Sequence, residues 1–340
     1  MMGMPEELWN DSYWSEIRDA HCHITDSMNK VEVGLAAMKT SQLTLMSTRL
    51  NDQELVERVA QDYGNRIRPS FGYHPWFTHM MWLGEEAPIC KEDHYRSVLT
   101  PEPTDQFTKA MPEPVSWNLF AQALRARLER FPLALVGEIG VDRSFRIPDP
   151  FREATTSKRT LSKYKVCPEH QVAILEAQVR IAAEYKRSIS VHDVHAHGAI
   201  LGLFQRLWAG FEPLSKAKLR EHRHPEDVAE EMARKQPFPT NICMHSYSGA
   251  ADNIKPYISL KVPSKVFFSF SIVINSRYAD WAEKVKAVPD NRLLVESDLH
   301  DASLIDQHIQ EAIEFLAQAK GWSIEDTVHR LHANHTAFLS

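Results

Sequence analysis

Eight short apolar runs alternate with longer segments of helical periodicity, and this alternation constrains the fold more than any other feature. The runs predict strands at residues 16–24, 42–48, 66–74, 133–142, 187–194, 240–248, 265–272 and 292–298. Helical patterns are predicted at residues 51–64, 116–131, 169–186, 249–258, 276–287, 302–320 and 323–338. Strands that alternate with helices predict a parallel sheet, and eight of them favour a closed (β/α)8 TIM barrel over an open doubly wound sheet. We expect residues 1–340 to form one such domain.

Composition narrows the classes of partner and location. The net charge of −6 provides no overall positive field that would hold long nucleic acids by counterion release, so a nucleic-acid substrate would need a local site. Four cysteines without a CxxC pair are typical of a reduced intracellular protein, cytoplasmic or nuclear. Because neither a secretory signal nor a membrane-spanning apolar run is visible, we expect no membrane partner.

Histidines and carboxylates occur at the ends of six predicted strands, where a barrel of this kind builds its functional site. They are His21, His23, His74, Glu138, His192, His245 and Asp298. Residues i and i+2 of a strand share a face, so His21 and His23 can reach one ion, while Cys22 faces the helices as a core residue. Imidazoles with carboxylates suit zinc, manganese or magnesium, and the lack of cysteine ligands argues against a structural zinc cluster.

These residues also have ordinary structural interpretations. An isolated histidine at a strand end is more often hydrogen-bonded than metal-bound, and a chance HxH pair is easily found among seventeen histidines. Glu138 and Asp298 are stronger indicators, because an ionised carboxylate in an apolar run is costly unless it is paired or bound to a metal.

Six motifs, in order, carry a family resemblance: DAHCHI, FGYHPW, VGEIGVD, SVHDV, MHSYSG and LLVESD. From residue 19 to about residue 300 the chain resembles an enlarged eukaryotic member of the TatD family of metal-dependent hydrolases, within the amidohydrolase superfamily. The resemblance implies a (β/α)8 barrel, one or two divalent ions, and phosphodiester hydrolysis as a 3′ to 5′ exodeoxyribonuclease. The implied ligands are His21, His23, Glu138 and Asp298 for one ion and Glu138, His192 and His245 for the other. His74 would face the site as a substrate contact.

The same resemblance assigns roles within the site. Glu138 would bridge two ions, and Asp298 would both hold one ion and take the proton from the attacking water. Glu296, two residues before Asp298, would either orient a ligand or belong to a carboxylate layer inside the barrel.

Two departures from the family pattern stand out. Val194 occupies the position where family members usually carry an arginine, which weakens the case for nuclease activity unless His195 replaces it as a substrate contact. Three segments also make the chain longer than typical members, at residues 77–115, 143–167 and 211–238. We expect them to follow strands three, four and five and to form a canopy over the site.

The first two segments differ in charge. Residues 77–115 hold seven acidic and three basic residues, whereas residues 144–168 hold six basic and two acidic ones. The basic segment is either a solvated loop or a guide for a phosphate backbone.

Three interpretations of function therefore stay open. The first is a metal-dependent phosphodiesterase that acts on DNA ends. The second is an interaction protein that keeps the metal-binding barrel and binds a protein partner at the enlarged rim. The third is a small-molecule amidohydrolase.

Overall fold

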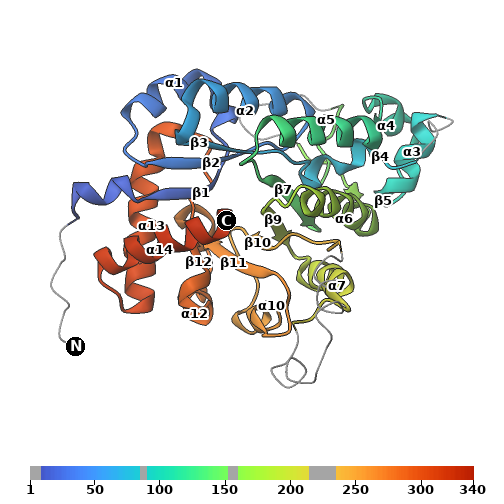
Figure 1. Cartoon of the computed structure of the whole chain (residues 1–340). Coiled ribbons are helices and arrows are strands. Elements are labelled where there is room, and N and C mark those ends of the chain that lie inside the picture. Colours follow the sequence, from blue (N-terminus) through green and yellow to red (C-terminus); the bar gives the residue numbers. More distant parts are fainter. Residues whose placement is uncertain (1–8, 85–89, 152–159, 214–234) are drawn as a thin grey trace.

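The computed structural model of the chain describes residues 9–84, 90–151, 160–213 and 235–340, and all eight predicted strands are present in it (Figure 1). They are β1 (Arg18–Cys22), β2 (Gln42–Met46), β3 (Ile67–Ser70), β7 (Val136–Asp142), β9 (Ile189–Val194), β10 (Asn241–Met244), β11 (Lys265–Phe270) and β12 (Leu293–Val295). Neighbouring strands are parallel, in the orders β1-β2-β3 and β12-β11-β10-β9-β7.

Backbone contacts close these two sheets into a barrel. Between β3 and β7, Ser70 forms a parallel bridge with Leu135. On the other side, the amide of Asp298 donates to the carbonyl of His21, 3.0 Å away, and joins the chain after β12 to β1. The predicted (β/α)8 TIM barrel is confirmed, and the closure brings the first and last strands of the sequence side by side.

Helices surround the strands in the predicted alternation (Figure 1). They are α1 (Met28–Ala37), α2 (Leu50–Tyr63), α5 (Trp117–Arg130), α6 (Pro168–Glu184), α7 (His197–Trp208), α10 (Lys255–Ile258), α11 (Ile272–Asn275), α12 (Trp281–Ala287), α13 (Ile305–Lys320) and α14 (Ile324–Leu339). The predictions for α2, α5, α6, α13 and α14 are confirmed, whereas α1 and α7 were not predicted. Residues 249–258 form only the short 3-10 helix η5 (Ala251–Ile254) and α10.

Helix α1 escaped prediction because its sequence lacks a clear apolar face. Val33 is 74% exposed, and Gly34 stands mid-helix, where glycine costs about 1 kcal/mol relative to alanine. Gly34 is needed for close packing, since a Cβ atom there would lie 2.5 Å from the Cβ of Ala302.

The last helix seals the end of the barrel opposite the site. Phe338 of α14 is fully buried and packs against residues that line the strands, among them Ala20, Leu135 and Phe267. The side-chain amide of Asn241, at the start of β10, donates to the carbonyl of Phe338 at 3.0 Å. The C-terminal helix therefore completes the hydrophobic interior and leaves the other end of the strands for polar residues.

The first two long segments form one lobe beside the C-terminal ends of β3 and β7 (Figure 1). Its elements are η4 (Pro75–Met80), β4 (Met81–Trp82), α3 (Lys91–Val98), β5 (Leu99–Thr100), α4 (Asp105–Ala110), β6 (Val115–Ser116) and β8 (Lys165–Val166). Strand β5, from the first segment, pairs antiparallel with β8 from the second. A small core joins the two segments and contains Tyr95, Val98, Leu99, Phe107, Met111, Ile147 and Tyr164.

The third long segment requires a correction. Residues 211–238 follow helix α7 and not strand five directly, because α7 occupies residues that were not predicted to be helical. At its described ends the rings of Phe211 and Phe238 lie 5.3 Å apart, just before β10 begins at Asn241. Helix-to-strand connections of a TIM barrel lie at the end opposite the site. The expectation that this segment follows strand five directly is therefore wrong, and residues 214–234, on which the predicted cover of the site depends, lie outside the described ranges.

Some predicted features fall on residues outside the described ranges. Half of the six basic residues of the second segment, namely Arg152, Lys158 and Arg159, are among them. Among the helices that the structure does describe, none combines the length and the apolar character needed to cross a bilayer.

Candidate metal centre

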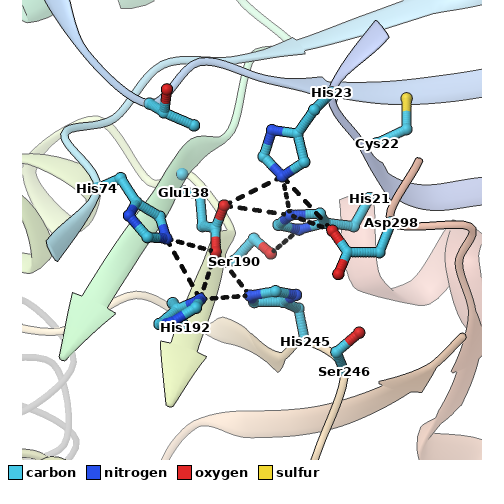
Figure 2. Close-up of polar contacts among 12 residues, drawn as sticks. His21, Cys22, His23, His74, Glu138, Ser190, His192, His245, Ser246 and Asp298 are labelled. Atoms are coloured by element: carbon cyan, nitrogen blue, oxygen red, sulfur yellow. Dashed lines mark hydrogen bonds and ion pairs between the residues drawn. The ribbon is translucent and has the colours of Figure 1, made fainter. Parts of the chain in front are cut away.

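Glu138 lies at the centre of a group of polar side chains at the C-terminal mouth of the barrel (Figure 2). It belongs to β7 and is only 2% exposed. The side chains whose nitrogen or oxygen atoms surround it come from five other strand ends: His21, His23, His74, His192, His245 and Asp298. The structure therefore brings together seven of the eight site residues predicted from the sequence, with His195 as the exception.

One carboxylate oxygen of Glu138 faces the pair of histidines from β1. Its Oε2 atom lies 3.2 Å from Nε2 of His23 and 3.5 Å from Nε2 of His21. These two nitrogens are 3.1 Å apart. Oδ1 of Asp298 lies 3.5 Å from Nε2 of His23. Two imidazoles and two carboxylates thus point to one place (Figure 2).

The other oxygen of Glu138 faces a second set of histidines. Its Oε1 atom lies 2.7 Å from Nδ1 of His192 and 2.7 Å from Nε2 of His245. Nε2 of His74 is 3.1 Å from the same oxygen. Each oxygen of one carboxylate therefore has its own group of nitrogen neighbours, which is the arrangement a bridging ligand needs.

Charge and burial favour an ionised Glu138, and they divide the surrounding imidazoles into two groups. Burial alone would raise the pKa of Glu138, but the surrounding histidines, with His74 and His245 foremost, hold it well below its usual value. Burial lowers the pKa of His74 to about 4 and also lowers that of His21. Burial opposes the charged form of His23, His192 and His245 as well, but the carboxylates beside them outweigh it: the pKa of His192 is raised to about 9, and those of His23 and His245 are also raised. A negative carboxylate and nitrogen lone pairs are the donors that a cation requires.

The donor atoms fit divalent ions. Three sets of three residues each place one ligand-type atom within 4.8 Å of the others: His21, His23 and Asp298; His21, Glu138 and His245; and His74, Glu138 and His192. Nitrogen and carboxylate donors without a thiolate suit zinc, manganese or magnesium. Cys22 points away from the group, as predicted, and its thiol donates to the carbonyl of Thr44 at 3.6 Å (Figure 2).

The hydrogen bonds of His74 distinguish it from the other histidines. Its Nδ1 atom accepts from the backbone amide of Trp76 at 3.1 Å, so in the neutral ring the proton is on Nε2. That nitrogen then donates to Glu138 and does not offer a lone pair. His74 faces the site, and its role as a contact that does not bind the ion stays a prediction.

Three buried polar residues behind the histidines were not recognised as a group from the sequence. Oγ of Ser190 is 2.8 Å from Nδ1 of His21, Oδ2 of Asp142 is 3.4 Å from Nε2 of His192, and Oε1 of Glu296 is 3.7 Å from Nδ1 of His245. Groups in this position fix the tautomer and orientation of metal-binding imidazoles. Ser190 is two residues before His192, so strand alternation was a usable signal for it.

Glu296 combines the two roles that the sequence left open. It is fully buried inside the barrel, where its Oε1 atom accepts from the amide of Ser246 at 2.7 Å and from the hydroxyl of the same residue at 2.5 Å. The hydroxyl of Ser269 donates to its Oε2 atom. Glu296 is therefore a carboxylate of the barrel interior that also faces the distal nitrogen of His245.

Left-handed backbone turns follow three of the strands that carry the site. The φ angles are 53° at His195, 41° at Ser246 and 54° at Asp298, a region that non-glycine residues rarely adopt and that clusters at functional sites. The turn leaves the side chain of Asp298 14% exposed, toward the mouth. His195 is exposed, and among the described residues no hydrogen bond or ion pair joins it to the histidine group.

A cationic group that the sequence prediction missed borders the site on the side of β2. The guanidinium of Arg49 lies 3.2 Å from Oδ1 of Asp26 and 5.4 Å from the ring centre of Phe77. The ring of His300 bonds the same aspartate at 2.8 Å and stacks on His23 at 5.4 Å. Asp26, Arg49 and His300 follow β1, β2 and β12, which are far apart in the sequence, and closure of the barrel brings them together.

Comparison with known proteins agrees with this geometry. A family model described as TatD related DNase matches residues 18–340. Cut9-interacting protein scn1 of Schizosaccharomyces pombe is 38% identical over 330 residues, which cover 95% of this chain and 98% of the relative. The uncharacterized deoxyribonuclease YMR262W of Saccharomyces cerevisiae is 26% identical over 292 residues, with 84% and 83% covered.

Solved structures show the same fold at low sequence identity. YjjV, a TatD homologue from Escherichia coli, superposes with a TM-score of 0.61 at 15% identity and covers 95% of this chain and 97% of its own. A TatD family hydrolase from Entamoeba histolytica gives a TM-score of 0.60 at 11% identity, with 95% and 97% covered. On the evidence of the family match, the curated relatives and the barrel-mouth histidines, the chain belongs to the TatD-related DNase family of metal-dependent hydrolases.

Proposed function

We propose that the protein is an intracellular metal-dependent phosphodiesterase that acts on DNA ends as a 3′ to 5′ exodeoxyribonuclease. The observation that carries the proposal is the position of Glu138, whose two carboxylate oxygens face separate groups of imidazole nitrogens. The family match and the name of the budding-yeast relative support DNA as the substrate.

The chain offers two neighbouring places for divalent ions. His21, His23, Asp298 and Oε2 of Glu138 would hold one ion. His192, His245 and Oε1 of Glu138 would hold the other. Zinc, manganese or magnesium bound there would lower the pKa of a water molecule and place positive charge opposite the phosphate oxygens.

Side chains behind the ligands prepare them for this role. When Nε2 of His192 donates to Asp142 and Nδ1 of His21 donates to Ser190, the opposite ring nitrogens present lone pairs to the site. His74 donates to Glu138 and keeps its carboxylate plane fixed.

Asp298 is the group that would move the proton. It is the most exposed of the candidate ligand side chains, at 14%, and it stands at the mouth where an attacking water enters. A carboxylate within hydrogen-bond reach of that water can accept its proton while phosphate oxygens remain bound. We assign substrate contacts to His74 and, in place of the family arginine, to the exposed His195 at the end of β9.

The decisive assay uses purified, metal-supplemented protein and single-stranded oligonucleotides labelled at the 5′ end or the 3′ end. The proposal expects a ladder of 5′-labelled products that shorten one nucleotide at a time, with immediate release of a 3′ label as mononucleotide. Simple carboxylic esters and amides are tested in parallel. Hydrolysis of those compounds without cleavage of any oligonucleotide would instead identify a small-molecule amidohydrolase.

A second candidate function is protein binding at the enlarged rim. The S. pombe relative, which aligns over nearly its whole length, is named for an interaction with another protein. In addition, Phe151 and Leu161 of the second segment are 52% and 51% exposed. In cells that lack the protein, a Glu138→Gln chain that restores every wild-type property would favour binding over catalysis.

A further inference from the structure

Trp76 is a partly exposed aromatic side chain whose orientation is fixed by its neighbours. It is 39% exposed, yet its indole N–H donates to Oδ2 of Asp142 at 2.6 Å. Its ring stacks on that of Phe145, with centroids 5.0 Å apart and an angle of 11° between the planes. A hydrogen bond at one edge and a parallel ring on one face leave little rotational freedom to this side chain.

This aromatic pair borders the candidate metal centre. The ring centre of Trp76 lies 4.7 Å from that of His74, edge to face, and 6.2 Å from that of His192. Asp142, which holds the indole, also faces Nε2 of His192 at 3.4 Å. The exposed part of Trp76 is thus one side chain away from the group around Glu138.

The chemistry of this surface favours a flat, uncharged π system as its ligand. Single exposed aromatics are common and need no explanation, but this one is held in place by the buried carboxylate of Asp142 beside the candidate metal centre. Because the ring is already ordered, a ligand that stacks on it loses little additional conformational entropy. A nucleobase next to a phosphodiester has the required shape, and every base has a π face.

We propose that Trp76, supported by Phe145 and Asp142, is a specificity-determining residue that stacks with the base of the nucleotide whose phosphodiester bond reaches the metal centre. The inference rests on the proposed nuclease function and names the part of the substrate that this function leaves open. Stacking of this kind tolerates all four bases, and it requires an unpaired base that is not stacked inside a double helix.

Binding is tested with oligonucleotides that carry slowly hydrolysed phosphorothioate linkages at the 3′ end. Three forms are compared: complete, without the terminal base, and without the penultimate base. For the wild-type protein we expect removal of one of these bases to raise Kd at least about fivefold. In Trp76→Leu, Kd for the complete oligonucleotide should rise by a similar factor, and the difference between complete and base-free forms should vanish.

Two further variants separate stacking from folding. Trp76→Phe keeps an aromatic face without the hydrogen bond to Asp142, and it should retain most of the base dependence. Trp322→Leu is the matched control, because Trp322 lies between α13 and α14, beside Lys320, which bonds the carbonyl of Val288 near the start of β12. That is the end of the barrel away from the site, so this variant should bind like wild type.

The outcomes distinguish this inference from the proposed function. If wild-type Kd does not depend on either base, or if Trp76→Leu keeps the full base dependence, the stacking inference is overturned. Unmodified oligonucleotides that resist cleavage would overturn the nuclease proposal, while the Kd comparison would still decide whether Trp76 stacks with a base.

Discussion

Asp142 and His192 face each other across the edge of the metal centre. Oδ2 of Asp142 lies 3.4 Å from Nε2 of His192, while Nδ1 of the same ring lies 2.7 Å from Glu138. Burial alone would raise the pKa of Asp142, but hydrogen bonding to His192 and Trp76 lowers it to about 2, so the carboxylate is ionised at neutral pH. The ring is therefore held with Nδ1 directed at the site.

The first prediction follows from this pair. Asp142→Asn removes the negative charge behind His192 while keeping the shape of the side chain, and we expect affinity for the second ion to fall about 10- to 100-fold. Calorimetric titration of chelator-treated protein with Mn²⁺ or Zn²⁺ measures the change. Asp193→Asn is the control, because Asp193 lies next to His192 on the strand but bonds His197 at 2.7 Å. Equal ion affinity in both variants would contradict the assigned role of Asp142.

The second prediction concerns occupancy of the centre. We expect at least one divalent ion per chain in freshly purified protein, and a lower melting temperature after chelation, because a ligand that binds only the folded state stabilises it. At a free ion concentration 100 times Kd the gain is about 2.7 kcal/mol. Elemental analysis and melting curves test this. A His21→Ala, His23→Ala double variant should show a much smaller effect of chelator, and a metal-free wild-type protein insensitive to added ions would refute the assignment.

The third prediction concerns Glu138. Glu138→Gln keeps the side-chain volume but removes the charge that two ions would share, so hydrolysis should fall by orders of magnitude. Folding should largely survive, since the variant side chain can still bond the neighbouring histidines. Circular dichroism and melting curves check the fold, and metal content is measured alongside activity. Full activity at unchanged metal content would exclude Glu138 from the mechanism.

The sequence predicted the strands and the residues around Glu138 because both depend on local signals. Apolar runs mark buried strands, and alternation places His21 and His23 on one face. The pairing of Asp142 with His192 depends instead on the register between β7 and β9, in which Gly140 lies opposite His192. Register between strands far apart in the chain cannot be read from either strand alone.

The errors in predicting the connections between strands and helices had a similar origin. Helix α7 begins at His197, within a histidine-rich stretch that suggested a strand end and a binding loop. Because that helix was missed, the third long segment was predicted to follow strand five directly, whereas it follows α7. The exposure of Trp76 could not be predicted either, since a tryptophan after an apolar strand is ordinarily assigned to the core.

The last prediction concerns stability at acid pH and a histidine away from the metal centre. His335 of α14 is 2% exposed, and burial, with help from nearby Arg18 and Arg68, lowers its pKa to about 3. Above pH 6.5 the ring is neutral in both folded and unfolded chains and has no effect. As the pH falls from 6.5 toward 3, only the unfolded chain takes up the proton, so the folded state loses stability, by about 2 kcal/mol at pH 5.

His335→Gln removes this titration, so its free energy of unfolding should fall about 2 kcal/mol less than that of wild type between pH 7 and pH 5. Urea unfolding of chelator-treated protein gives the comparison, because loss of ions on acidification then contributes nothing to the change in the free energy of unfolding. His308→Gln serves as the control: its ring bonds the carbonyl of Leu304 at 2.9 Å in a water-accessible position on α13, and the variant should keep the wild-type pH dependence. If both variants respond to acid as wild type does, another buried group governs the loss, and His79, whose pKa burial also lowers to about 3, is the next to replace.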